Sequence, residues 1–226
     1  HVPDGQECVF DERNAWIFGT FLGTRYRGCT VMWLPGGDSA PAKADAVWQA
    51  MARGLKEGSR GRHLVSYHGD WLSSSSEWYH GAEWLDFNTV QSGHTWESDN
   101  YAFISVDRAL SPAKPTVDME PSYENHPVGG GRAPIDSHKV RSQGYTAMLA
   151  GAAGHGYGAL DLFCFFKDED GPFPRGGGGW KDEAFRDWRT AIGYEGSAQM
   201  GLMRRFFEKR PWYKLAPAQS LIASYK

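Results

Sequence analysis

The feature that most constrains the fold is an alternation of short apolar segments with amphipathic ones along the chain. Residues 30–34 read TVMWL, an apolar run without polar alternation, which is typical of a strand buried on both faces. Residues 42–56 carry Val47, Met51 and Leu55 on one stripe at helical spacing. The two patterns recur at intervals of roughly 25 to 40 residues, which predicts a parallel sheet with helical crossovers and hence an α/β fold.

The remaining elements are predicted from the same two patterns. Apolar runs predict strands at 63–68, 85–91, 115–119 and 159–166. Helical spacing of apolar or small residues predicts helices at 14–26, 100–110, 139–153 and 198–209, the last two with Ser137 and Ser197 as N-caps. We therefore expect five strands alternating with helices, within one domain that spans residues 1–226.

Composition narrows the class of protein further. Of the 226 residues 41% are apolar, enough to bury a core, and the formal net charge of −3 offers no basic surface for nucleic acid or an anionic membrane. No apolar run approaches the roughly 18 residues of a membrane-spanning helix, and three cysteines are too few for a disulfide framework. Aromatic residues reach 14%, with 10 Trp, and such rings suit both core packing and sugar-binding clefts.

Polar side chains gather where the predicted strands end. In a parallel α/β fold the carboxyl ends of the strands lie at one edge, and active sites form there. The residues at these positions are Asp38, Tyr67, His68, Gln91, His94, Asp118, Glu120, Lys167 and Asp168. The pattern therefore predicts a functional site at this edge.

Two carboxylates stand out at the edge, because a turn-forming neighbour fixes the direction of each. Gly36 and Gly37 precede Asp38, and Pro121 follows Glu120. A pair of carboxylates is what glycoside hydrolysis requires, one to protonate the leaving oxygen and the other to attack the anomeric carbon or activate water. The residues alone leave a structural alternative open for each: a helix N-cap for Asp38 and an ion pair with an arginine for Glu120.

Two other chemistries fit the sequence less well. His63, His68, His94 and Asp118 follow or begin strands and are metal-ligand types, but they lack the HxH or HExxH spacing that places two ligands on one face. The serines of 73–76 lack the GxSxG frame of a nucleophilic serine. We therefore expect neither a metal nor another cofactor.

Seven blocks of sequence, in order, carry a resemblance to a known family. They are WLPGGD (33–38), WQAMARGLKEG (48–58), HLVSYH with SSSSEWYH (63–80), WLDFNTVQSGH (84–94), KPTVDMEPSYENHPV (114–128), GAAGHGYG (151–158) and KRPWYKLAPAQSLI (209–222). Together they resemble the catalytic domain of apiosidase-like glycoside hydrolases of the family 140 type. The resemblance implies a (β/α)8 barrel from a bacterial enzyme of plant-polysaccharide degradation, acting on apiose-containing side chains of pectin.

The resemblance also implies roles for individual residues. Asp38, in the GGD block, would be the general acid/base, and Glu120, in the D-x-E-P block, the nucleophile. We expect Tyr67 to orient Glu120. The residues that would line the sugar subsite are Tyr67, His68, Trp71, Gln91, His94, Asp118 and Tyr123.

If Glu120 closes the seventh strand of such a barrel, residues 159–166 form the eighth and residues 30–34 the fourth. The chain is then an N-terminally truncated piece of a TIM-type barrel, with about five βα units, because a complete barrel takes about 250 residues. We expect its C-terminal end to lead towards an accessory β domain that the sequence lacks. An open barrel exposes a strand edge, which predicts self-association.

The sequence therefore predicts a glycoside hydrolase that removes a terminal sugar, apiose or a related one, from plant cell-wall side chains, with a carbohydrate as its substrate and no nucleic acid or membrane as a partner. Retention of anomeric configuration is the expected outcome, and a secreted or periplasmic location is expected of the longer parent. A non-catalytic carbohydrate-binding fragment and a metal-dependent barrel hydrolase remain as alternatives.

Overall fold

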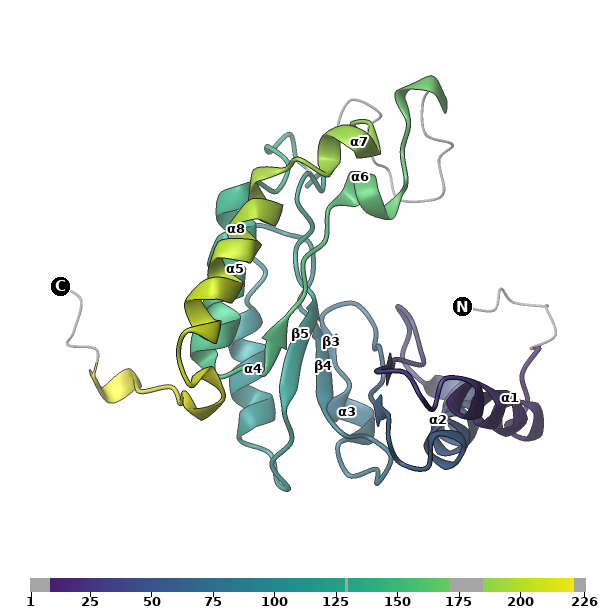
Figure 1. Cartoon of the computed structure of the whole chain (residues 1–226). Helices are drawn as coiled ribbons and strands as arrows, with labels where there is room; N and C mark the ends of the chain where they lie inside the picture. The colour runs from purple at the N-terminus through teal and green to yellow at the C-terminus, as the bar shows by residue number, and fades with distance from the viewer. Residues whose placement is uncertain (1–8, 129, 171–184, 222–226) are drawn as a thin grey trace. The chain divides into compact units, whose positions relative to one another are not determined.

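The computed structural model describes residues 9–128, 130–170 and 185–221 (Figure 1). The chain divides into two compact units. Unit 1 comprises His1–Gln91 and Val106–Val117, and unit 2 comprises Ser92–Ser105 and Asp118–Lys226. Among the described residues no helix combines the length and the apolar character that a membrane crossing requires.

Unit 1 begins with two long helices that lie side by side (Figure 1). Helix α1 (Glu12–Arg25) starts at a capping box, in which the side chain of Asp11 accepts from the backbone of Asn14 and the side chain of Asn14 accepts from the backbone of Asp11. The short helix η1 (Ala42–Ala44) leads into α2 (Asp45–Ser59). The predicted helices at 14–26 and 42–56 are thereby confirmed.

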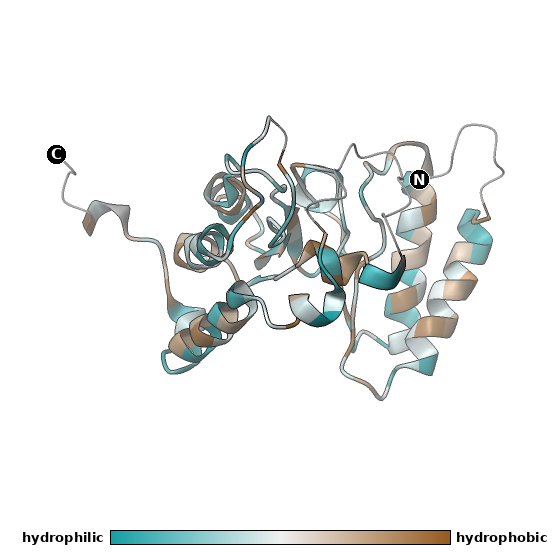
Figure 2. Cartoon of the chain, turned by 90° about the horizontal axis from the view of Figure 1, so that it is seen from above, coloured by the Kyte–Doolittle hydropathy of each residue, from teal (hydrophilic) through white to brown (hydrophobic). Residues whose placement is uncertain are grey.

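Glycines form the contact between α1 and α2. A Cβ atom at Gly54 would overlap the carbonyl oxygen of Trp16 and lie 2.9 Å from the backbone nitrogen of Thr20. Gly58 is equally close to Thr20, so the two backbones touch. Several bulky side chains of α1 stay exposed, and Phe21 is 53% exposed. Figure 2 shows apolar residues spread along both helices of this pair, beside the N mark.

The strands of unit 1 are short. Strands β1 (Met32–Trp33) and β2 (Leu64–Val65) pair in parallel, as the apolar runs predict. Strand β3 (Ser73–Ser74) and helix α3 (Ser76–Tyr79) follow, and β3 pairs antiparallel with β4 (Asn88–Gln91). The backbone of Asn88 donates to Pro115, so β4 runs beside the segment that opens β5 (Thr116–Glu120). Strand β5 begins in unit 1 and ends in unit 2.

Unit 2 is built on the end of β5 and on β6 (Gly154–His155), joined by a hydrogen bond of 2.7 Å from the backbone of Gly156 to Asp118. Helix α5 (Ser137–Ala150) packs against α8 (Glu195–Glu208), with Met148, Met203 and Phe207 between them. The other elements are α4 (Asn100–Arg108), which begins in this unit, α6 (Leu160–Phe163), η2 (Asp168–Asp170), α7 (Trp188–Ala191), η4 (Trp212–Lys214) and η5 (Gln219–Leu221).

The strand predicted at 159–166 is wrong. The strand lies earlier, at β6, and residues 160–163 form the short helix α6. The carboxylate of Asp161 is fully buried and accepts from the side chains of Asn125 and Tyr194, so the apolar run folds around an interior acid. An apolar run cannot reveal such a turn, because the run shows only that the segment is apolar and not which distant residues it contacts.

Three helix ends also differ from the predictions. Asp136, not Ser137, caps α5, because its carboxylate accepts from the backbone of Lys139. Helix α8 begins one turn early, after Tyr194 and not after Ser197. Helix α2 continues through Gly58 and ends at Arg60, which adopts the left-handed conformation.

Candidate active site

The turn after β1 presents Asp38 to solvent. Gly36, Gly37 and Asp38 all have positive φ angles, of 102°, 133° and 46°. A Cβ atom at Gly36 would overlap the carbonyl oxygen of His68 and lie 2.7 Å from the ring of Tyr67, so only glycine fits there. The turn is thus pressed against the end of β2, and the Asp38 side chain stands 73% exposed.

Two side chains of unit 1 face the Asp38 carboxylate. Gln91 Nε2 donates to Asp38 Oδ1 over 3.2 Å, and His68 Nδ1 lies 3.9 Å from the same oxygen. Trp71, two residues beyond Gly69 in the next loop, is 45% exposed. Unit 1 therefore holds an accessible acid, an amide that donates to it, an imidazole beside it, and an indole ring open to solvent.

Tyr67 belongs to the support of this turn. Its hydroxyl donates to the carbonyl of Ser39 over 2.9 Å, and its ring is fully buried among the rings of Trp48, Trp78 and Tyr79. Burial raises the pKa of Tyr67 to about 12, so the hydroxyl keeps its proton and remains a donor. The expectation that Tyr67 orients Glu120 is corrected, because its hydroxyl is committed to the backbone next to Asp38.

Unit 2 holds the second carboxylate, Glu120, at the end of β5. Its Oε1 accepts from the hydroxyl of Tyr123 at 2.8 Å and lies 3.2 Å from Nε2 of His94. The Glu120 side chain is 13% exposed. A Cβ atom at Gly158 would overlap the Tyr123 ring, so this glycine gives the ring its place. Glu120 is therefore held in one orientation, close to solvent.

His126 also belongs to this group, although it is not among the site residues that the sequence predicts. Its ring stacks on that of His94, with centroids 4.8 Å apart and planes at 26°. Its Nδ1 lies 2.9 Å from the carbonyl of Pro127, an acceptor only, so Nδ1 carries the proton. Burial, followed by the neighbouring charge of His94, lowers the pKa of His126 to about 4. The only sequence signal was its position six residues after Glu120 in the same block.

The low pKa of His126 predicts how stability varies with pH. In the unfolded chain this imidazole titrates near 6.5, so between pH 6.5 and 4 the unfolded state binds a proton that the folded state does not. The free energy of unfolding should therefore fall as the pH is lowered from 6.5 to 4. Above pH 6.5 the His126 imidazole is neutral in both states and does not lower the stability. Urea unfolding at pH 7 and pH 5 should show a smaller loss in His126→Gln than in the wild-type chain.

A matched control for this experiment is His138→Gln, because His138 is exposed on α5. This variant should lose as much stability between pH 7 and pH 5 as the wild-type chain. An equal loss in His126→Gln and in the wild-type chain would show that His126 does not couple folding to protons.

Asp118 lies in the interior of unit 2. It is fully buried and accepts from Asn100 Nδ2 at 2.8 Å and from the hydroxyl of Ser92 at 3.2 Å. His155 Nδ1 lies 3.4 Å from its Oδ2. A carboxylate enclosed in this way joins β5 to α4, so the sugar contact expected of Asp118 does not fit its burial.

The structure thus gathers the expected residues into two sets, one in each unit. Asp38, His68 and Gln91 lie together in unit 1, and Glu120, His94 and Tyr123 lie together in unit 2. Both sets follow strands of a βα repeat. An acid that follows a strand and is held by neighbouring polar side chains is a feature of glycoside hydrolases of the (β/α)8 type.

Comparison with solved structures agrees with this class. A crystal structure titled as a glycoside hydrolase family 5 protein from Bacteroides vulgatus superposes with a TM-score of 0.84 at 31% identity, over 96% of this chain and 49% of that one. A second, titled as a glycoside hydrolase, has a TM-score of 0.83 at 30% identity, over 96% and 51%. The chain therefore forms part of a (β/α)8 barrel and spans about half the length of these proteins.

The family follows from the sequence itself. Residues 2–214 match the family described as apiosidase-like, catalytic domain, and the chain belongs to this family. The resemblance drawn from the seven sequence blocks is thereby confirmed. No curated protein matches the chain.

Proposed function

We propose that the chain is the active part of a retaining glycoside hydrolase that removes a terminal apiose, or a related sugar, from side chains of plant cell-wall polysaccharide. The observation that carries the proposal is the environment of Glu120. One oxygen of this carboxylate accepts from Tyr123 and lies within hydrogen-bond distance of His94, and these two contacts fix the direction of the carboxylate.

In the proposed mechanism Glu120 attacks the anomeric carbon while Asp38 protonates the leaving glycosidic oxygen. The sugar is then attached to Glu120, and water activated by Asp38 releases it with retained configuration. Tyr123 and His94 keep Glu120 oriented through both steps. Gln91 donates to Asp38, whose exposure allows it to exchange its proton with water.

Two further residues suit the binding of a sugar. The indole of Trp71 is open to solvent in the loop after β2, and aromatic faces stack on the apolar faces of sugar rings. The imidazole of His68 is 80% covered and lies beside Asp38, so a sugar bound at this carboxylate would meet its ring. The choice of apiose rests on the family to which the chain belongs.

The test is the release of aglycone from a panel of aryl glycosides, aryl apioside included, by this chain at pH 5 to 7. We expect turnover of at least one member, with the aryl apioside fastest, because the two carboxylates supply acid catalysis and a nucleophile. Folding is checked by circular dichroism, and sugar binding by calorimetry. Binding without turnover, by a folded chain, would favour the carbohydrate-binding alternative and contradict the proposal.

A further inference from the structure

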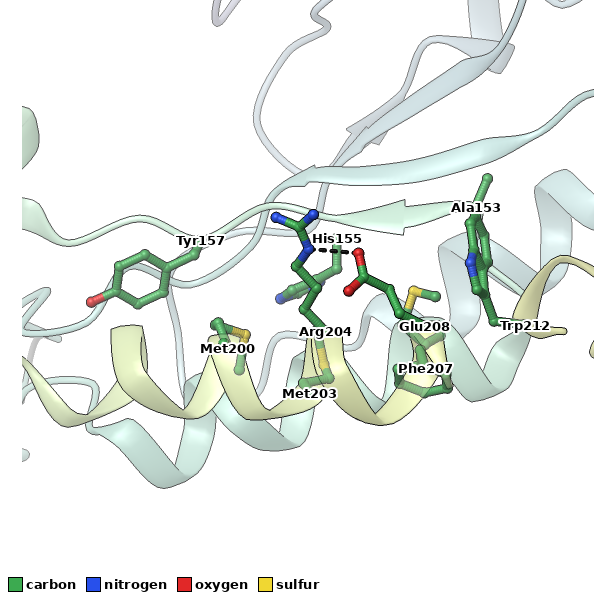
Figure 3. Close-up of a pocket in the computed structure, with 11 residues that line it drawn as sticks. Ala153, His155, Tyr157, Met200, Met203, Arg204, Phe207, Glu208 and Trp212 are labelled. Atoms are coloured by element: carbon green, nitrogen blue, oxygen red, sulfur yellow. Dashed lines mark hydrogen bonds and ion pairs between the residues drawn. The ribbon is translucent and has the colours of Figure 1, made fainter. Parts of the chain in front are cut away.

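Unit 2 contains a pocket that the proposed chemistry does not use. It lies between β6 and α8, has a volume of about 410 Å³, and is lined by none of the residues placed around Asp38 or Glu120 (Figure 3). Thioether and aromatic side chains make most of its wall. The lining residues include Met148, His155, Met200, Met203, Phe207 and Trp212.

His155 brings an unused nitrogen to this pocket. Its side chain is 1% exposed, and neither of its ring nitrogens has a hydrogen-bond partner among the described residues. Nδ1 lies 3.4 Å from the buried carboxylate of Asp118. A carboxylate on the Nδ1 side suits a histidine whose second nitrogen ligates a metal. Burying a nitrogen without any partner is otherwise costly.

Two methionine sulfur atoms converge on the same imidazole. A Cβ atom placed on Gly144 of α5 would lie 2.8 Å from Met203 Sδ, 3.3 Å from Met200 Sδ and 3.3 Å from Cδ2 of His155, the ring atom bonded to Nε2. The two sulfurs and the ring therefore all lie against Gly144, which places them close to one another. Figure 3 shows Met200, Met203 and His155 on facing walls of the pocket.

We propose that this pocket binds a single Cu(I) ion through Met200 Sδ, Met203 Sδ and His155 Nε2. Thioether sulfur is a soft ligand that selects Cu(I), and imidazole suits copper as well. Zn²⁺ and Mg²⁺ are disfavoured, because the lining offers no thiolate and its one carboxylate, Glu208, is paired with Arg204 at 2.7 Å. Flexible methionine side chains can close on the ion with small movements. The site is independent of the proposed hydrolysis.

The test is an anaerobic titration of the chain with Cu(I) against a coloured Cu(I) chelator. Thiols bind the same ion, so Cys8, Cys29 and Cys164 are first replaced by serine and the fold is checked by circular dichroism. We expect one tightly bound ion per chain, and at least tenfold weaker binding in Met200→Leu and in Met203→Leu. Met51→Leu is the matched control, because Met51 is buried in the core of unit 1, and it should bind as its parent does.

A second readout uses the same cysteine-free chain with methyl-labelled methionine. One equivalent of Cu(I) should shift the methyl resonances of Met200 and Met203 and leave that of Met51 in place. Absence of a one-to-one complex, or equal affinity in Met200→Leu, Met203→Leu and Met51→Leu, would overturn the proposal. A shift confined to resonances other than those of Met200 and Met203 would do the same.

Discussion

Asp38→Asn and Glu120→Gln should differ in how their glycosylation rates depend on the leaving group of the substrate. A dinitrophenolate departs without protonation, whereas an alcohol needs an acid. Asp38→Asn should therefore keep the glycosylation rate on dinitrophenyl glycosides and lose about 10²- to 10⁴-fold on substrates with poor leaving groups. Glu120→Gln should lose about 10⁴-fold or more on both, because no nucleophile remains. Single-turnover release of the aglycone measures the difference.

The control for both variants is Glu208→Gln, which removes an exposed carboxylate of α8 whose ion pair with Arg204 lies outside the proposed active site. It should leave turnover unchanged. If Asp38→Asn lost activity equally on good and poor leaving groups, Asp38 would not be the proton donor. If Glu120→Gln retained turnover, Glu120 would not be the nucleophile.

The second large effect concerns the stability of unit 1. A methyl group at Gly54 has no room, since it would overlap the backbone of Trp16 in α1. Gly54→Ala should therefore force α1 and α2 apart and lower the free energy of unfolding by about 2 to 4 kcal/mol, despite the better helix propensity of alanine. Urea unfolding measures the loss.

Gly201→Ala, in α8, supplies the matched comparison. The nearest atom to its new methyl group would be Arg205 Nη1 at 3.7 Å, so nothing opposes the gain in helix propensity. This variant should be about 0.5 to 1 kcal/mol more stable than the wild-type chain. Equal effects of alanine at Gly54 and Gly201 would mean that α1 and α2 do not meet through their glycines.

Local sequence patterns were enough to predict most elements of the fold. The apolar runs become β1, β2, β4 and β5, as unbroken apolar runs predict. Burial on both faces holds for β4 but not for β1 or β2, where Met32 is 58% exposed and Leu64 is 48% exposed. The same patterns misplaced the last strand, because the turn at α6 depends on Asn125 and Tyr194, which are distant in sequence from Asp161. The glycine contact between α1 and α2 could not be predicted for the same reason. Taken locally, a glycine in a helix indicates only a lower helix propensity.

The candidate site divides in a similar way. Position after a strand singled out Asp38, Glu120, His94 and Gln91, because the ends of strands are defined locally. The roles of Tyr67 and His126 depend on contacts with residues that are distant in sequence. Tyr67 supports the turn of Asp38, and His126 stacks on His94, and neither role follows from spacing in the sequence.

The most direct test of the central claim, that Glu120 is the nucleophile of a retaining glycosidase, is the capture of the sugar on its side chain. An aryl apioside with fluorine next to the anomeric carbon reacts slowly in both steps, and a dinitrophenolate leaving group restores only the first, so the covalent intermediate accumulates. Mass spectrometry of the digested chain should find one added sugar on the peptide that contains Glu120, and none in Glu120→Gln. Hydrolysis of the unfluorinated apioside with no adduct formed, or an adduct on another carboxylate, would contradict the account.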